Sequence, residues 1–300
     1  MASWDELSAS FHAMGGPNHV RIAARGQRLL RRALAAVQAE VQRLEAKYSI
    51  YRADSVLSRI NATAGSGQAV AVDAETAALL DFAGHLHAVS GGRFDVTSGA
   101  LRRCWNFAGQ EIPDAKCLRQ ALTCVGWQRL RWQGGHITLP LCGMALDFGG
   151  IVKEYAADRA VMVLRQHGVN HGYVNLAGDM ALAGPRPDGQ PWILAIRHPR
   201  RPDSVAMELS LQGGALATSG DYERFMDVGG RRFCHILDAR TGWPPECWQS
   251  VSVIAPSCAA AGALATVAFL LAEQGPTFLK QQGVLHACLG SSADNISLKS

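Results

Sequence analysis

A chain of 300 residues with 48% apolar and 18% charged residues is long enough and apolar enough to bury a substantial core, which excludes a disordered protein. The formal net charge is only +4. Arginines are scattered through residues 21–43, with a small group at Arg197, Arg200 and Arg201, but no long block of like charge occurs. We therefore expect no nucleic-acid partner.

The cysteines and the apolar segments bear on the compartment. The eight cysteines include no Cys-x-x-Cys pair, which argues against a zinc site, and several lie in apolar stretches typical of reduced thiols. The first residues lack the basic and apolar regions of a secretory signal. The longest apolar run, residues 263–272, is shorter than the roughly 20 residues of a membrane span. These patterns predict reduced cysteines, no membrane span and a cytoplasmic location.

Hydrophobic spacing predicts four helices and a set of short strands. Apolar residues at helical spacing occur in residues 27–47, 73–89, 151–167 and 259–273. Asp73 is the expected N-cap of the second helix, and Gly168 ends the third. Strand candidates are short apolar runs between turn residues: 19–24, 145–147, 173–176, 192–197, 206–211, 214–218, 233–237 and 250–255.

Turn residues set the expected organisation. A hairpin is expected within residues 130–139, turning at Gly134 and Gly135, and residues 185–191 form the best-marked loop. The mixture of short strands and long helices predicts an α+β fold rather than a doubly wound sheet. We expect one continuous domain.

The segment ALDFGGIVKEYAAD, residues 145–158, is the most informative. A strand that ends at Asp147 and a helix that begins near Ile151 would leave the backbone N–H groups of Gly149 and Gly150 unpaired, and such groups bind anions at a helix N-terminus. Lys153 adds a positive charge in the first helical turn. The alternative is that the two glycines only pack the helix against the strand.

Standard catalytic signatures are missing from the sequence, including the dinucleotide-binding and Walker glycine motifs, the His-Glu-x-x-His zinc motif and the Gly-x-Ser-x-Gly nucleophile motif in a suitable context. Instead, five blocks join glycines or turns to acidic and hydroxyl residues: residues 51–61, 90–97, 174–179, 217–222 and 235–242. Each block alone can be a capped turn. Five together predict loops that converge on one polar ligand.

These blocks resemble the FAD:protein FMN transferase family, the ApbE-type flavin transferases. The matching segments are FHAMG (11–15), YRADSVLSRIN (51–61), SGGRFDVTSGAL (90–101), LDFGGIVKEYAADR (146–159), VNLAGDM (174–180), GALATSGDYERF (214–225), HILDARTGWP (235–244) and SVSVIA with ALAT (250–266). They occur in the family's order and extend from about residue 11 to about 275. The resemblance implies an α+β flavin-transferase fold over residues 1–300, with mixed or antiparallel sheets and long helices around a central FAD cleft.

The resemblance also implies a reaction. Such enzymes cleave the pyrophosphate of FAD, release AMP and attach FMN through a phosphoester to a threonine or serine of an acceptor protein, usually with a divalent metal. The FAD-binding residues implied are Met14, Tyr51, Arg93, Phe94, Asp95, Asp147, Lys153, Ser219, Asp221 and Ile236. Among these, Met14 matches the pocket wall, Tyr51 an aromatic beside the flavin nucleotide, and Phe94 and Asp95 the loop on the adenine-ribose side.

His235 and Lys153 are the catalytic candidates. The histidine can accept the proton of the incoming hydroxyl or orient the phosphate, and the lysine can meet a pyrophosphate oxygen. The alternative is a structural histidine held by Asp238, Asp221 or a backbone carbonyl. An Asx turn would likewise explain Asp221 without a ligand.

The metal site departs from the family pattern. The resemblance implies magnesium ligands at the Gly150 carbonyl and at Thr266, but the acid expected four residues before that threonine is Gly262. Loss of an anionic oxygen should weaken Mg²⁺ binding. Three alternatives follow: the metal binds only together with substrate phosphate, another acid such as Asp179 replaces the lost ligand, or the metal is absent. The family's usual Lys-Gly pair is Lys153-Glu154 in this chain, and Glu154 either faces solvent or adds the missing negative charge.

Two functional hypotheses follow. The first is a transferase that flavinylates an acceptor protein; the second is an FAD store or chaperone with weak or no transferase activity, because Gly262 replaces the metal-binding acid. The family mostly works outside the cytoplasmic membrane, whereas the patterns above favour the cytoplasm.

Overall fold

The computed structural model describes residues 4–109, 111–290 and 298–299. A central seven-stranded antiparallel sheet has the order β1-β2-β6-β7-β10-β13-β14. Its strands are β1 (Asp5–Ala13), β2 (Gly16–Ala24), β6 (His171–Leu176), β7 (Asp179–Gly184), β10 (Ala215–Gly220), β13 (Trp248–Ala255) and β14 (Leu285–Gly290). The predicted α+β class is confirmed.

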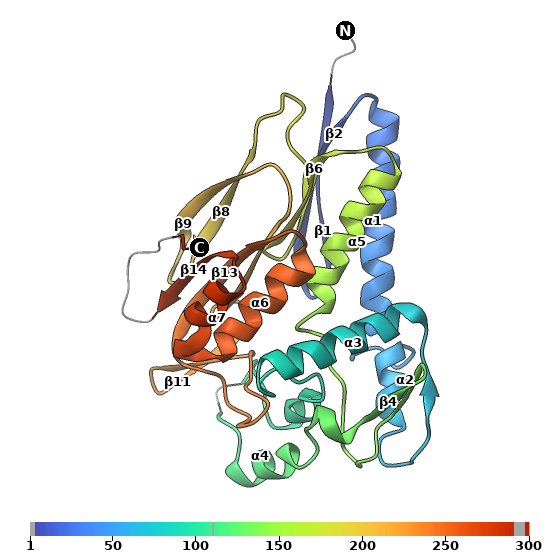
Figure 1. The fold of residues 1–300 in the computed structure, drawn as a ribbon, viewed down its shortest axis with the longest axis vertical. Coiled ribbons are helices and arrows are strands. Elements are labelled where there is room, and N and C mark those ends of the chain that lie inside the picture. The colour runs from blue at the N-terminus through green and yellow to red at the C-terminus, as the bar shows by residue number, and fades with distance from the viewer. Residues whose placement is uncertain (1–3, 110, 291–297, 300) are drawn as a thin grey trace.

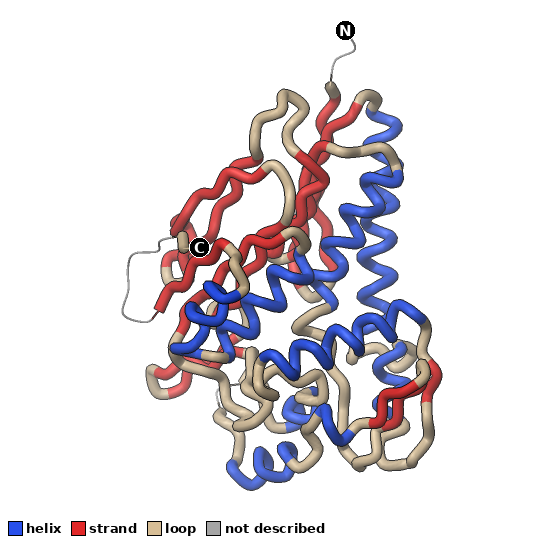
Figure 2. The backbone as a smooth tube through the Cα atoms, viewed as in Figure 1, coloured by secondary structure: helices blue, strands red, loops and turns tan. Residues whose placement is uncertain are grey.

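Three long helices cover one face of this sheet (Figures 1 and 2). They are α1 (Gln27–Tyr48), α5 (Val152–Gln166) and α6 (Cys258–Leu270). The opposite face of β7 and β10 packs against the two-stranded sheet of β8 (Trp192–His198) and β9 (Arg201–Leu211). Every residue of β7 is therefore buried, because the strand is covered on both sides.

The remaining elements form the lower part of the molecule in Figure 1 and the edges of the sheet. The helices are α2 (Val56–Ala62), α3 (Ala74–Val89), α4 (Ala115–Leu122) and α7 (Gly275–Gln281), with short 3-10 turns η1 (Gly99–Arg103), η2 (Trp127–Arg129) and η3 (Ala272–Gln274). The small strands are β3 (Val70–Ala71), β4 (Arg131–Gln133), β5 (His136–Thr138), β11 (Phe225–Val228) and β12 (Arg231–Cys234). The N-terminal end of α5 points toward α3, so the start of this helix lies between the sheet layers and the lower part.

Three predictions that depend only on neighbouring residues are confirmed: a helix cap, a hairpin turn and the buried face of a helix. The Asp73 carboxylate accepts a hydrogen bond from the Thr76 N–H at 2.9 Å and caps α3. The predicted hairpin turns at Gly134 and Gly135, whose positive φ angles of 57° and 73° suit glycine. One face of α1 is buried at Leu30, Val37 and Leu44, as the spacing predicts.

Other predictions were wrong at particular residues. The strand expected at 145–147 is only an isolated bridge between Ser98 and Ala145. The strand expected at 233–237 ends at Cys234, because β12 pairs only with the four residues of β11. Strands β1, β7 and β14 were not predicted from the sequence.

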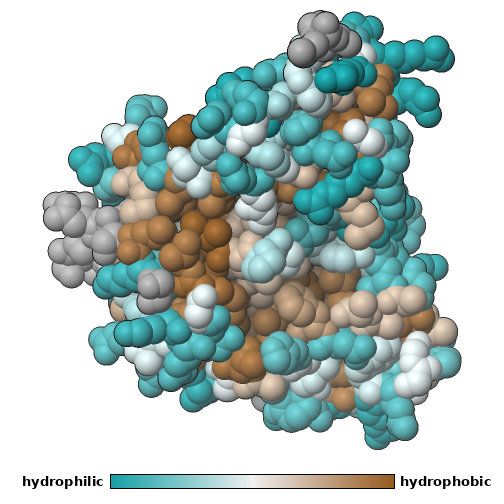
Figure 3. Space-filling view, turned by 45° about the horizontal axis from the view of Figure 1, so that its top comes forward, coloured by the Kyte–Doolittle hydropathy of each residue, from teal (hydrophilic) through white to brown (hydrophobic). Residues whose placement is uncertain are grey.

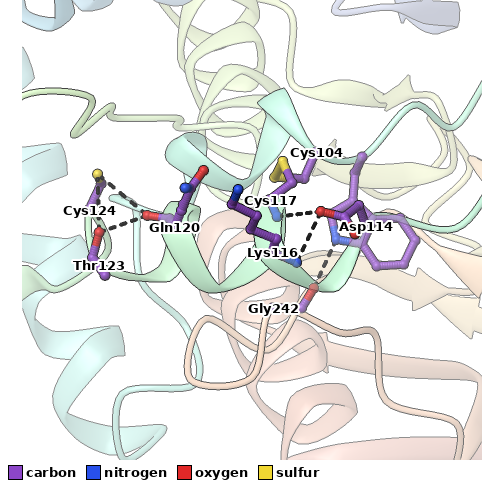
Figure 4. The surroundings of a disulfide bond; sticks show 9 residues. Cys104, Asp114, Lys116, Cys117, Gln120, Thr123, Cys124 and Gly242 are labelled. Carbon is purple, nitrogen blue, oxygen red and sulfur yellow. Dashed lines mark hydrogen bonds between the residues drawn. A yellow bond between two sulfur atoms is a disulfide. The ribbon is translucent and has the colours of Figure 1, made fainter.

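One cysteine pair contradicts the expectation of reduced thiols. Cys104 and Cys117 form a disulfide that ties the end of η1 to α4, beside the Asp114 carboxylate that caps this helix (Figure 4). The two residues are 13 positions apart, a spacing that a motif search for metal or redox pairs does not detect. Disulfides persist in oxidising compartments. The cysteines therefore no longer support a cytoplasmic location, which stays a prediction.

The surface is not uniformly hydrophilic. On the face seen in Figure 3, apolar side chains gather into a band bordered by hydrophilic residues. Within the described residues, no helix has the length and apolar character needed to cross a bilayer.

Candidate active site

The loop before α5 is organised by Asp147. Its Oδ1 accepts a hydrogen bond from the Gly149 N–H at 2.8 Å, and its Oδ2 pairs with Arg102 Nη1 at 2.9 Å. The expectation that the Gly149 N–H is free for an anion was therefore wrong, since this donor is used inside the loop. α5 begins at Val152, and Ile151 provides no side-chain cap. Lys153 lies in the first turn, as predicted.

Gly150 is required by close packing. A Cβ at this position would lie 2.9 Å from Cε2 of Phe94, so the ring of the predicted adenine-side loop rests directly on the glycine turn. The packing hypothesis is therefore supported at Gly150, whereas anion binding at the start of α5 stays a prediction.

Asp95 is committed to bonds within the protein. Its Oδ1 accepts from the N–H and hydroxyl of Thr97 at 2.8 and 2.7 Å, and its Oδ2 accepts from the Trp127 N–H at 2.7 Å. These bonds fix the loop that carries Phe94. A direct contact between Asp95 and FAD stays a prediction.

Lys153 pairs with a carboxylate from the central sheet. Its Nζ lies 2.8 Å from Asp179 Oδ2, at the first residue of β7, and the aspartate side chain is almost fully buried. Desolvation lowers the pKa of the Lys153 ammonium, but the Asp179 and Glu154 carboxylates outweigh it and raise that pKa above its ordinary value. Lys153 is therefore charged in the folded protein.

Glu154 turns into the interior rather than toward solvent. Only 7% of the residue is exposed, and its Oε2 has no hydrogen-bond partner among the described residues. Burial, together with the nearby Asp179 carboxylate, raises the pKa of Glu154 to about 8. The alternative of a solvent-facing Glu154 is thereby excluded.

Two hydroxyl groups join β10 to α6. Ser219 Oγ and Thr266 Oγ1 lie 2.8 Å apart, and both residues are buried. The preceding Thr218 N–H donates to Asp179 Oδ1 at 3.0 Å. The predicted ligands Ser219 and Thr266 are thus brought next to the aspartate that pairs with Lys153.

His235 follows β12 and is held by a backbone carbonyl. Its Nδ1 lies 3.1 Å from the Arg224 carbonyl oxygen, one of the alternatives considered from sequence. The residue remains accessible to solvent, yet the surrounding protein desolvates the ring and lowers the pKa of His235 to about 4. The charges of Arg224, Lys153 and Asp147 also act on this ring, so the histidine belongs to the same region as the start of α5.

Tyr51 is 75% exposed and lies beside Arg102 and Arg224, two arginines that were not predicted as site residues from the sequence. Arg102 stacks over its ring at 4.9 Å and donates a hydrogen bond to its hydroxyl. Desolvation raises the pKa of Tyr51, but hydrogen bonds from Arg102 and Arg224 bring that pKa below its ordinary value. Both arginines adjoin or lie within matched blocks, at residues 90–101 and 214–225, which is the signal that could have identified them.

The other predicted ligands have separate contacts. Met14 adopts a positive φ of 56° in the β1–β2 turn and donates its N–H to Glu45 Oε1 at 2.6 Å. Asp221 accepts from Arg200 Nη1 at 2.7 Å, and Arg93 Nη1 lies 3.9 Å from Asp238 Oδ2. Ile236 packs against the apolar core. The FAD contacts of these residues stay predictions.

The chain matches a known family over nearly its whole length. The sequence model of the ApbE family matches residues 14–289. The chain belongs to the ApbE family. An FAD:protein FMN transferase of Treponema pallidum is 34% identical over 250 residues, covering 77% of this chain and 69% of that protein. One from Vibrio cholerae is 31% identical over 248 residues, covering 79% of this chain and 74% of the relative.

Solved ApbE structures have the same fold. The crystal structure of the ApbE protein from Thermotoga maritima gives a TM-score of 0.91 at 28% identity, covering 99% of this chain and 97% of that one. The apo form of Pseudomonas stutzeri flavinyl transferase ApbE gives 0.87 at 28% identity, covering 99% and 95%. The family predicted from the sequence blocks is confirmed.

Proposed function

We propose that this ApbE-family protein is an FAD:protein FMN transferase that joins FMN to a threonine or serine of an acceptor protein and releases AMP. The curated relatives that carry this name support the proposal. The structural observation that carries it is the gathering of the Lys153 ammonium and the His235 ring at the N-terminal end of α5. We also propose that residues 1–300 act as a single flavin-transferase domain.

His235 is suited to accept a proton through Nε2. A carbonyl oxygen can only accept, so the contact with Arg224 places the ring hydrogen on Nδ1 and leaves the lone pair on Nε2. In the proposed reaction, the acceptor hydroxyl oxygen attacks the FMN phosphorus and its proton passes to Nε2. The bond from that phosphorus to the bridging oxygen breaks, and AMP leaves with the electron pair.

Cationic side chains offset the charge of the diphosphate. Lys153 is charged and anchored by Asp179, while Arg102 and Arg224 converge on Tyr51. Fixed positive groups in a partly desolvated site stabilise negative charge that develops on phosphate oxygens. We assign FAD binding to these residues together with the set predicted from the family blocks.

A divalent cation, which supplies Lewis-acid polarisation of the phosphate when bound, fits the donor chemistry of this region. The candidate donors are the Gly150 carbonyl, the Thr266 hydroxyl and a carboxylate of Asp179 or Glu154, while Gly262 has no side-chain donor. Among the residues that the structure describes, no three His, Cys, Asp or Glu side chains form a cluster suited to a metal. Magnesium, however, typically uses only one or two protein carboxylates, with waters and substrate phosphate completing its shell.

The test is a product analysis. Purified protein is incubated with FAD and Mg²⁺, with and without threonine- or serine-containing peptides, and the mixture is examined by liquid chromatography and mass spectrometry. We expect AMP together with FMN or an FMN-modified peptide, and we expect EDTA to suppress both. FAD that binds but stays intact in every mixture would refute the transferase and leave the FAD-store hypothesis.

A further inference from the structure

Two departures from the family pattern occupy the same space. The resemblance described above implies a glycine at the position of Glu154 and an acid at the position of Gly262. A Cβ at residue 262 would lie 2.4 Å from Cγ, 3.0 Å from Cδ and 3.1 Å from Oε1 of Glu154. The Glu154 side chain therefore fills the volume that a side chain on α6 would need.

We propose that Glu154 is the carboxylate ligand of the divalent cation in this protein, supplied from α5 in place of the acid that α6 lacks at Gly262. The inference rests on the proposed function, because it assumes that the reaction uses such a cation. In this proposal the carboxylate ligand moves from α6 to α5, and the cation site is kept.

The packing of α5 against α6 places Glu154 opposite Gly262. The Asp158 carboxylate of α5 accepts hydrogen bonds from the Cys258 and Ala259 N–H groups at 2.7 and 2.8 Å, which anchors the start of α6. One turn earlier on α5 is Glu154, and one turn later on α6 is Gly262. The two helices pack together (Figure 1), so the pairs 158/258 and 154/262 follow each other along one contact.

Glu154 also lies on the side of α6 that carries the predicted hydroxyl ligand of the cation. Thr266, the predicted hydroxyl ligand, lies one turn beyond Gly262 on the same face of α6. Glu154 Oε2 is buried without a hydrogen-bond partner among the described residues, an arrangement that costs free energy unless something binds there. The nearby Asp179 carboxylate has the Lys153 ammonium at 2.8 Å, whereas no positively charged side chain forms an ion pair with Glu154 among the described residues.

Manganese binding measures the site without relying on turnover. Mn²⁺ prefers the same oxygen ligands as Mg²⁺, and free Mn²⁺ can be counted by electron paramagnetic resonance in titrations with and without FAD. The variant Glu154→Gln keeps the size of the side chain but removes its charge. The matched control is Glu40→Gln, a partly buried glutamate that pairs with Arg43 and Arg159 on α1 and α5.

We expect Glu154→Gln to weaken Mn²⁺ binding about tenfold or more, and Glu40→Gln to leave it unchanged. The double variant Glu154→Gly/Gly262→Asp, which restores the family arrangement, should bind Mn²⁺ within a few-fold of the native protein. Gly262→Asp alone should not tighten binding, because its side chain collides with Glu154. Circular dichroism identifies which variants are folded, and the double variant tests the exchange if Glu154→Gln does not fold.

Three results would overturn the inference: native protein that binds no Mn²⁺, folded Glu154→Gln with native affinity, or a folded double variant that stays as weak as Glu154→Gln. FMN transfer by the native protein is measured separately. Transfer that persists while Glu154→Gln binds Mn²⁺ normally defeats only this inference, whereas Glu154-dependent Mn²⁺ binding without any FAD cleavage defeats only the proposed function.

Discussion

The ammonium of Lys153 lies 2.8 Å from the buried carboxylate of Asp179, and this pair joins the first turn of α5 to the first residue of β7. The two residues come from blocks 26 positions apart in the sequence. The ion pair therefore does two things: it holds the Lys153 ammonium in the proposed active site, and it connects helix α5 to the central sheet.

Replacing Lys153 with Met should impair both stability and reaction. The variant leaves the Asp179 charge buried without its partner, so we expect the free energy of unfolding to fall by about 2–4 kcal/mol in urea titrations. FMN transfer should fall about 100-fold or more. The double variant Lys153→Met/Asp179→Asn should regain part of the stability but not the activity. Native-like stability and turnover of Lys153→Met would contradict this account.

Replacing His235 with Ala should affect the chemical step more than FAD binding. Loss of a positioned proton acceptor is expected to lower kcat by about 10²–10⁴-fold, while calorimetry should show FAD affinity within a few-fold of native. The exposed His136 in the β5 hairpin provides a matched control as His136→Ala, for which native kcat is expected. A fully active His235→Ala variant rules out the assigned role.

The pH profile follows from the state of His235. Its pKa is lowered to about 4 by desolvation, so the neutral, proton-accepting ring is present above that value. The acid limb of kcat/KM, measured with saturating metal, should therefore lie below the ordinary histidine pKa of about 6.5. An acid limb centred at or above 6.5 that disappears in His235→Ala would show that the ring is not desolvated.

Acid stability should depend on Glu75, a carboxylate of α3 that pairs with Arg43 and Lys47 of α1. Hydrogen bonds from Arg43 and Lys47 outweigh desolvation and lower the pKa of Glu75 to about 2. A lowered folded-state pKa stabilises the fold above the unfolded value near 4.5, and that contribution is lost as the pH falls from about 4.5 to 2.

Glu75→Gln should therefore be less stable near neutral pH, by about 1 kcal/mol after allowance for solvent screening, and should lose less stability on acidification. Thermal unfolding between pH 2 and 7 measures both effects. Parallel stability curves for the two proteins would argue against this ion pair as the cause.

The Cys104–Cys117 disulfide should make stability sensitive to reductant. Closing a loop of this size restricts the unfolded chain, so Cys104→Ser/Cys117→Ser should lower the free energy of unfolding by about 2–3 kcal/mol. Native protein should lose a similar amount in dithiothreitol, and the double variant should not respond. Equal stability of the native protein with and without reductant would show that the bond does not form in solution.

Sequence patterns predicted the features that depend on neighbouring residues. The α1 stripe, the Asp73 cap and the Gly134–Gly135 turn each reflect a local period or a local backbone requirement, and all three are confirmed. The order of the sequence blocks that resemble the family predicted the family, which the comparisons confirm. By contrast, β7 (DMALAG) shows no alternation because both of its faces are buried, so no period distinguished it as a strand.

What the sequence alone determined was therefore the fold class, the family and the set of residues available to the site. Tertiary structure decided which partners those residues have. The Gly149 N–H donates its hydrogen bond to Asp147, and Lys153 pairs with Asp179. The Glu154 side chain fills the space beside Gly262. The physical reason is that a side chain's partner depends on which segments pack together. The packing of α5 against α6 and β7 brings together residues that are 26 to 108 positions apart in the sequence. Local sequence patterns do not show which residues at such separations come into contact.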